Sequence, residues 1–459
     1  MKFENEAKKI KSKRFIKIVK AKIPWLSHVI DENLAGDLNI EKKEKSNLIK
    51  IKIPKGSRCI YCRGAKLLCG KSNCPVIQRA YSFSKIEKKL SNEIEGCSPP
   101  SIFVGRIGYP IVYAGPAVPP VIGDTSIYDT PELWLGKDIS ELLNFRFSLI
   151  RGKTLVNVKS FENSKFIEKT QELALSKNPV EAEMILKSKP SASFIIDSEV
   201  QPFGPGGVLK DFRVGEIKSE QKIERIFYDK DLKAEDAIID LYKNHLEISK
   251  IQKAFSIGMF GLKSQRRLVP TRWSITAVDS IISKNLIEEI KQYPWINEYR
   301  IYEFIHLDRK FVVFLLPDAW SYELIEAWYP RTTWNPNSNF IAICSDGESY
   351  FGRSEYPSIG GCYFAARLAV AEALKNEKRQ GRAIVISEAY PGHIMPVGVW
   401  EVRESVREAL KNPPQVFNSL EESLRYLSLI LKTKLSQLLE TSENLRYYIK
   451  QERLTKFLK

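Results

Sequence analysis

The sequence lacks a long hydrophobic run. Its longest apolar stretches are short, such as residues 311–316, whereas a helix needs about 18 apolar residues in a row to cross a bilayer. The chain begins Met-Lys-Phe-Glu-Asn-Glu, with no continuous apolar segment, so we expect no secretory signal. Seven cysteines, an odd number spread over 459 residues, argue against a disulfide scaffold. We therefore expect a soluble cytoplasmic protein with no membrane partner.

The sequence also has few histidines and none of the common catalytic motifs. The four histidines are His28, His245, His306 and His393, and none has a companion at metal-ligand spacing. The chain contains no Walker-type phosphate loop, no Gly-x-Ser-x-Gly elbow and no His-Glu-x-x-His motif. The enzyme classes that these motifs define are excluded, and the catalytic residues, if any, stay unassigned.

Positive charge is concentrated in one part of the chain. Of the formal net charge of +16, residues 1–90 carry 23 Lys and Arg against 8 Asp and Glu, a net of +15. The other 369 residues carry 48 against 47, a net of +1. A local basic excess is typical of nucleic-acid binding, because neutralised phosphates release their counterions. We expect this basic head to bind DNA; a solubilising face and a helix lying on anionic lipid are the alternatives.

The composition, with 43% hydrophobic and 27% charged residues, is that of a globular protein. Strand-like and helix-like segments alternate, which predicts a mixed α/β (α+β) fold with mixed sheets covered by helices. Leucines between positions 420 and 438 recur every three or four residues and predict one long C-terminal amphipathic helix. We divide the chain into a Lys-rich extension (1–55), a four-cysteine knuckle plus helix (56–98), two α/β regions (99–300 and 301–440) and a tail (441–459).

The patterns predict a strand pair at residues 301–305 and 311–316, and helices at residues 138–150, 160–176, 234–246, 274–290, 363–376 and 401–411. They also predict three more helices. Residues 78–94 fit a helix that ends at Gly96, because glycine readily adopts the left-handed geometry of a helix end. Residues 179–188 fit a second helix, and residues 321–328 fit a short third one.

Four cysteines lie within 16 residues, in the pattern Cys59-x2-Cys62-x6-Cys69-x4-Cys74. Four thiolates in tetrahedral geometry are a typical structural zinc site, which leaves no open position for a substrate. We therefore predict a structural zinc rather than a catalytic one. An iron–sulfur cluster is the alternative, because Cys74-Pro75 matches the Cys-Pro that closes bacterial ferredoxin motifs, although the other spacings differ.

The last nine residues fit the pattern of a peptide that binds the sliding clamp, PCNA. Leu454, Phe457 and Leu458 fall on one side of a single helical turn and suit an apolar pocket, and Gln451 lies one turn earlier. Leu458 departs from the favoured double aromatic. A chain end is accessible for docking, so we predict that the tail binds PCNA.

Long and unusual strings mark the middle of the chain. They are residues 98–110 (SPPSIFVGRIGYP), 115–116 (GP), 124–126 (DTS), 129–134 (DTPELW), 268–279 (LVPTRWSITAVD) and 395–404 (MPVGVWEVRE). With the cysteine cluster and the tail, they resemble the archaeal Nre family of DNA repair proteins over roughly residues 56–459. The resemblance implies a role in the DNA damage response and a clamp-binding C-terminus, but no particular reaction. The Lys-rich extension and Leu458 depart from the family pattern.

Some of these strings look suited to a ligand. Glycines allow close backbone approach, Arg grips phosphate with two hydrogen bonds, Trp stacks on bases and helix N-termini attract anions. Two aspartates could hold Mg²⁺ beside a bound nucleotide. The candidate nucleotide or nucleic-acid pocket comprises Arg106, Tyr109, Asp124, Arg272, Trp273, Ser274 and Asp279. The alternative is that these residues form tight turns and core packing.

Together these observations predict an accessory DNA repair protein of the archaeal cytosol, associated with the nucleoid. Its basic, zinc-bearing head binds DNA and its tail binds PCNA, which raises its local concentration on DNA. The alternatives are a nucleotide-binding enzyme that carries out phosphoryl transfer on an adenine nucleotide, with secondary DNA contact, and a protein scaffold whose basic head is only solubilising.

Overall fold

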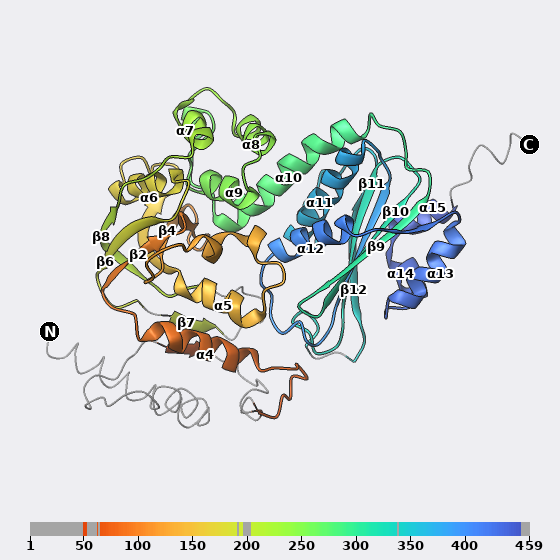
Figure 1. Cartoon of the computed structure of the whole chain (residues 1–459), viewed down its shortest axis with the longest axis horizontal. Coiled ribbons are helices and arrows are strands. Elements are labelled where there is room, and N and C mark those ends of the chain that lie inside the picture. The colour runs from red at the N-terminus through yellow and green to blue at the C-terminus, as the bar shows by residue number, and fades with distance from the viewer. Residues whose placement is uncertain are drawn as a thin grey trace, which may run out of the picture.

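Two six-stranded sheets, one in each half of the chain, organise the protein (Figure 1). The computed structural model describes residues 49–52, 62, 65–190, 192–195, 203–336 and 339–450. Helices cover both sheets, which confirms the mixed α/β class expected from the sequence. Within the described residues, no helix is both long and apolar enough to cross a membrane.

The first sheet curls until its edges approach each other. Its strands are β2 (Glu93–Ser98), β3 (Ser101–Val104), β4 (Ile111–Val118), β5 (Ile150–Asn157), β6 (Val180–Leu186) and β8 (Gly206–Val214). They lie in the order β2-β6-β8-β5-β4-β3; β5 and β8 pair in parallel and the other neighbours antiparallel. Because only two residues separate β2 from β3, the opposite edges must meet. The Ser98 hydroxyl at the end of β2 donates to the Ala117 carbonyl in β4 at 2.8 Å.

Helices and short elements surround this sheet. They are α4 (Pro75–Glu87), α5 (Ile139–Ser148), α6 (Lys165–Leu175), α7 (Gln221–Tyr228), α8 (Ala234–Lys243) and α9 (Ile248–Ser256), with the 3-10 turns η1 (Ser126–Asp129), η2 (Pro131–Leu133) and η3 (Lys263–Gln265). A capping box starts α5: the Asp138 carboxylate accepts from the Glu141 N–H, and the Glu141 carboxylate accepts from the Asp138 N–H. The short strands β1 (Ile49–Lys52) and β7 (Ala192–Ile195) pair in parallel.

The second sheet is buried on both faces. Its strands are β9 (Tyr299–His306), β10 (Arg309–Leu316), β11 (Ser321–Trp328), β12 (Ala342–Glu348), β13 (Arg382–Ala389) and β14 (Gln415–Phe417), in the order β12-β11-β13-β10-β9-β14. One face packs against α10 (Thr271–Ile290), α11 (Gly361–Glu377) and α12 (Trp400–Lys411), and the other against α13 (Leu420–Ile430), α14 (Leu435–Thr441) and α15 (Glu443–Lys450) (Figure 1).

Alternate residues of β10 serve these two cores. Phe311 and Val313 join the core under α10 to α12, whereas Val312 and Phe314 join the core under α13 to α15. This follows from the two-residue period of a strand, whose successive side chains point to opposite faces.

Two segments predicted as helices are strands. In β6, buried Val180, Ala182 and Met184 alternate with the more exposed Glu181 and Glu183, a period of two that helical spacing obscured. In β11 every residue is buried, because helices cover both faces of its sheet. A strand covered on both sides shows no alternation, so periodicity alone does not identify it.

Two other predicted helices are shorter than expected. The helix assigned to residues 78–94 ends at Glu87, and Gly96 lies inside strand β2 rather than at a helix end. The leucine-rich C-terminal face is divided between α13 and α14. The helix is interrupted between α13 and α14. There the backbone N–H groups of Lys432 and Thr433 donate to the Glu388 carboxylate, at 3.2 and 2.7 Å.

Candidate functional site

The structure brings four of the seven predicted pocket residues to one surface. The loop after β3 carries Arg106 and Tyr109, and the first turn of α10 carries Arg272 and Trp273. A hydrogen bond at 2.9 Å from the Val104 N–H to the Thr271 hydroxyl joins the two segments. The rings of Tyr109 and Trp273 meet at a centroid distance of 5.1 Å with an interplanar angle of 53°, and they are 43% and 46% exposed. Both arginines are exposed as well.

The other three predicted residues do not join this surface. Ser274 is buried and donates to the Gln252 carbonyl at 2.6 Å. Asp279 is buried too, and both of its carboxylate oxygens accept from Arg403, at 2.9 and 3.0 Å. Asp124 lies exposed in the loop after β4, where its carboxylate accepts from the Ser126 N–H. Asp124 and Asp279 therefore do not form a magnesium site together.

The described part of the cysteine cluster comprises Cys62, Cys69 and Cys74, and Cys59 lies outside the described residues. Cys62 and Cys69 are free thiols. The Cys62 sulfur is buried and accepts from the Leu68 N–H at 3.3 Å. Within the described residues, no group of three or more His, Cys, Asp or Glu side chains is arranged to hold a metal ion. The zinc prediction, which requires Cys59, therefore stays a prediction.

The chain between these cysteines docks on the second half of the protein. The Lys71 ammonium is buried, donates to the Ile394 carbonyl and lies 3.4 Å from the Thr333 hydroxyl oxygen. Gly70 has a φ of +72° and lies so close to the Arg331 side chain that an added Cβ would stand 2.0 Å from it. A residue larger than glycine therefore does not fit at position 70 without displacing Arg331.

A cluster of buried charged side chains lies next to the contact between Lys71 and Ile394. The sequence did not predict this cluster. Glu401, at the start of α12, faces the Nδ1 atoms of His306 and His393 at 3.8 and 3.6 Å. Arg309 bonds Glu326 at 2.5 Å and lies 3.8 Å from Glu401. These residues come from β9, β10, β11, the loop after β13 and α12, so only the fold brings them together. Sequence spacing contains no signal for such a cluster.

The pKa values of Glu401 and His393 are both shifted downward within the cluster. Burial alone raises the pKa of Glu401, but His393, His306 and Arg309 outweigh it and hold that pKa below its usual value. Burial lowers the pKa of His393, against the opposing attraction of Glu401. The unfolded chain therefore binds protons at His393 more readily than the folded chain does.

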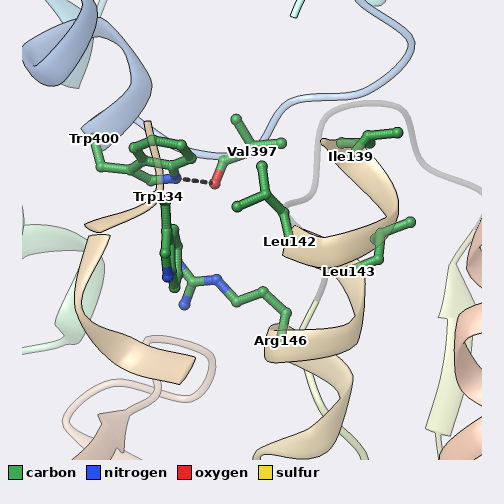
Figure 2. Close-up of a pocket in the computed structure, with 7 residues that line it drawn as sticks. All are labelled: Trp134, Ile139, Leu142, Leu143, Arg146, Val397 and Trp400. Atoms are coloured by element: carbon green, nitrogen blue, oxygen red, sulfur yellow. Dashed lines mark hydrogen bonds between the residues drawn. The ribbon is translucent and has the colours of Figure 1, made fainter. Parts of the chain in front are cut away.

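A small apolar hollow lies beside this cluster, between the two halves (Figure 2). It is lined by Trp134, Ile139, Leu142, Leu143, Arg146, Val397 and Trp400. The Trp400 indole donates to the Val397 carbonyl at 2.9 Å, and the Arg146 guanidinium lies over the Trp134 ring at 4.6 Å. Because these side chains contact one another, we assign the hollow to packing between the two halves of the protein.

Replacing His393 by Asn tests the electrostatic account of the cluster. Since His393 has a depressed pKa when folded, it makes the protein less stable as the pH falls below its unfolded value of about 6.5. We expect the free energy of unfolding of His393→Asn to fall less between about pH 7 and pH 5.5 than that of the unsubstituted chain. Urea unfolding at several pH values measures this.

His245→Asn is the matched control. His245 is exposed and has a φ of +60°, which Asn tolerates. This variant should keep the pH dependence of the unsubstituted chain. If the free energy of unfolding changes equally with pH in all three proteins, the electrostatic account of the cluster is wrong.

Comparison with known proteins places the chain in a family. The family model described as Archaeal Nre, N-terminal matches residues 68–335, and the model described as Archaeal Nre, C-terminal matches residues 348–457. No solved structure matches the chain significantly.

Three curated relatives match most of their own length. DNA repair protein NreB of Archaeoglobus fulgidus is 43% identical over 80% of this chain and 92% of the relative. DNA repair protein NreA of the same organism is 38% identical over 82% and 94%, and DNA repair protein NreA of Haloferax volcanii is 33% identical over 77% and 86%. The chain therefore belongs to the archaeal Nre family, as its sequence strings predicted.

Proposed function

We propose that this chain is an accessory DNA repair factor that binds DNA and acts in the cytoplasm at the archaeal nucleoid. The proposal rests chiefly on its 43% identity, over 80% of its length, to a protein named a DNA repair protein. The exposed ring pair of Tyr109 and Trp273, with Arg106 and Arg272 beside it, supports DNA contact. Aromatic rings next to basic side chains are typical of nucleic-acid surfaces.

The basic head is the proposed electrostatic anchor on DNA. Its net charge of +15 within residues 1–90 suits phosphate binding, and Cys59, Cys62, Cys69 and Cys74 supply the donor atoms that structural zinc prefers. Zinc held by the four thiolates would cross-link residues 59 to 74 into a fixed knuckle. Since Lys71 lies inside this segment and docks on the second half, the knuckle is the proposed link between the head and the body.

Replacing Cys69 by Ser tests whether the basic head binds zinc and DNA as proposed. We expect the zinc content of the purified full-length chain to fall from about one ion per chain to nearly none, and DNA binding to weaken, because small zinc sites do not fold without the metal. Elemental analysis and DNA titration measure the two effects. Cys344→Ser, at an exposed thiol outside the cluster, should change neither. Iron with visible absorbance and no zinc would contradict the zinc proposal.

The tail is the proposed tether to the sliding clamp PCNA. Its residues Gln451, Leu454, Phe457 and Leu458 lie outside the described residues and directly follow α15. α15 packs on the second sheet through Leu445 and Tyr448, so the tail starts from a fixed point of the body. Binding through both head and tail raises the effective concentration of a weak DNA binder.

Replacing Phe457 by Ala tests the tether. An aromatic anchor that fills a pocket carries much of the binding energy of a short peptide, so we expect affinity for PCNA to fall by about 30-fold or more. Calorimetric titration of full-length chain into PCNA measures this. Tyr447→Ala, an exposed aromatic of α15, is the matched control and should bind as the unsubstituted chain does. Equal affinities of the Phe457→Ala variant and the unsubstituted chain would overturn the tail assignment.

The competing function, phosphoryl transfer on an adenine nucleotide, gains no support from the described residues. Ser274 and Asp279, which would offer a hydroxyl and a metal ligand, are engaged by Gln252 and Arg403 instead. Both side chains contribute to packing between helices, whereas the remaining candidates lie on an open surface. We therefore propose DNA contact, rather than nucleotide turnover, at Tyr109 and Trp273.

A further inference from the structure

A group of exposed aromatic and aliphatic side chains lies on β4, on β5, on the loop between β3 and β4, and on the first turn of α10. Each is between 43% and 88% exposed, whereas side chains of this kind are usually covered in a folded protein. We call this group the stacking platform; it consists of Ile107, Tyr109, Ile111, Tyr113, Leu155 and Trp273.

Backbone pairing and a ring contact join members of the platform in pairs. Tyr113 of β4 pairs with Leu155 of β5, so their side chains lie on the same face of the sheet. The Gly105 N–H donates to the Tyr113 carbonyl at 2.7 Å, which continues the β3–β4 pairing and fixes the start of the loop that carries Tyr109 beside β4. The contact between Tyr109 and Trp273 then joins the loop to α10.

Four cations border the platform, namely Arg106, Lys159, Arg267 and Arg272. All four are exposed, and in the described part of the chain no ion pair occupies their side chains. The backbone holds their segments together, since Val158 donates to the Pro110 carbonyl at 3.0 Å and accepts from the Leu268 N–H at 2.9 Å. Glu162, an acid of this region, acts instead on Lys230 and Arg266, where its charge works to raise the pKa against burial.

We propose that the stacking platform binds unpaired bases of single-stranded DNA, with Tyr109 and Trp273 stacking on the bases and the four bordering cations holding the phosphates. This inference rests on the proposed function and specifies which form of DNA the body of the protein recognises.

Two physical arguments favour single strands over duplex. The flat faces of bases are hidden inside a duplex and available in a single strand, so exposed rings gain stacking contacts only with the latter. Phosphates are equally available in both forms, and binding them requires cations but no apolar surface. The combination of exposed rings with free arginines matches a single strand, because the rings and the cations then both find partners.

Alanine substitutions at Tyr109 and Trp273 test the inference in the full-length chain. Stacking contributes about 1–3 kcal/mol per base, so each variant should bind a labelled oligothymidylate about 5- to 100-fold more weakly. Binding of a duplex of the same length should stay within about twofold, because the basic head still contacts its phosphates. Fluorescence anisotropy at one fixed salt concentration measures both affinities.

Conservative and matched variants separate stacking from folding. Trp273→Phe keeps an aromatic face and should retain most of the single-strand affinity. Trp295→Ala removes a tryptophan that is 49% exposed in the segment after α10 and should change neither affinity. Arg272→Gln should reduce the salt dependence of single-strand binding by about 0.7 per lost phosphate contact.

The possible outcomes are distinguishable. Unchanged single-strand affinity in Tyr109→Ala and Trp273→Ala would overturn the platform and leave DNA binding by the head standing. Equal losses of affinity for single-stranded and duplex DNA would also overturn the platform, because stacking on bases must weaken single-strand binding more than duplex binding. Failure of the unsubstituted chain to bind either form would instead overturn the proposed function itself.

Discussion

The ion pair between Asp279 of α10 and Arg403 of α12 is the constraint on which the rest of the structure depends. Both side chains are almost completely buried, and two hydrogen bonds join them. Breaking a buried pair by removing one partner typically costs about 3–5 kcal/mol, because it leaves a charge without compensation. One turn further along α12, Arg407 bonds Glu372 of α11 at 2.7 Å. The three helices α10, α11 and α12, on one face of the second sheet, are thus tied to one another by ion pairs.

This constraint reaches the first sheet because α10 runs from one half of the chain to the other (Figure 1). Its C-terminal part packs against α11, and Ile282 and Leu286 belong to the core that α11 shares with the second sheet, whereas its first residue, Thr271, accepts a hydrogen bond from β3. Trp273 is therefore held beside Tyr109 by a helix that is fixed at both ends. Rigid support of this kind suits a surface that must present rings to a ligand.

The sequence predicted the elements whose pattern is local. The predicted strands at 301–305 and 311–316 and the predicted helix at 274–290 follow from short apolar runs and clear breaks, and they lie within β9, β10 and α10. β6 and β11 could not be assigned from spacing, since their patterns depend on which faces the helices cover. Likewise, His306, His393 and Glu401 form a cluster only because β9, the loop after β13 and α12 converge.

The candidate pocket was predictable in part. In α10, Ser274 lies four residues before Val278 and eight before Ile282, so helical spacing places all three on the buried face. That signal was available in the sequence and separates Ser274 from the exposed Arg272 and Trp273. The burial of Asp279 was not predictable, because its partner Arg403 lies 124 residues further along the chain.

Hydrogen–deuterium exchange of the full-length chain, with and without a single-stranded oligonucleotide, tests the central claim most directly. If bases stack on Tyr109 and Trp273, exchange slows in peptides that cover residues 104–113 and 267–276 and stays unchanged in α13 and α14. Bound DNA that leaves both of these peptides unprotected would contradict the account.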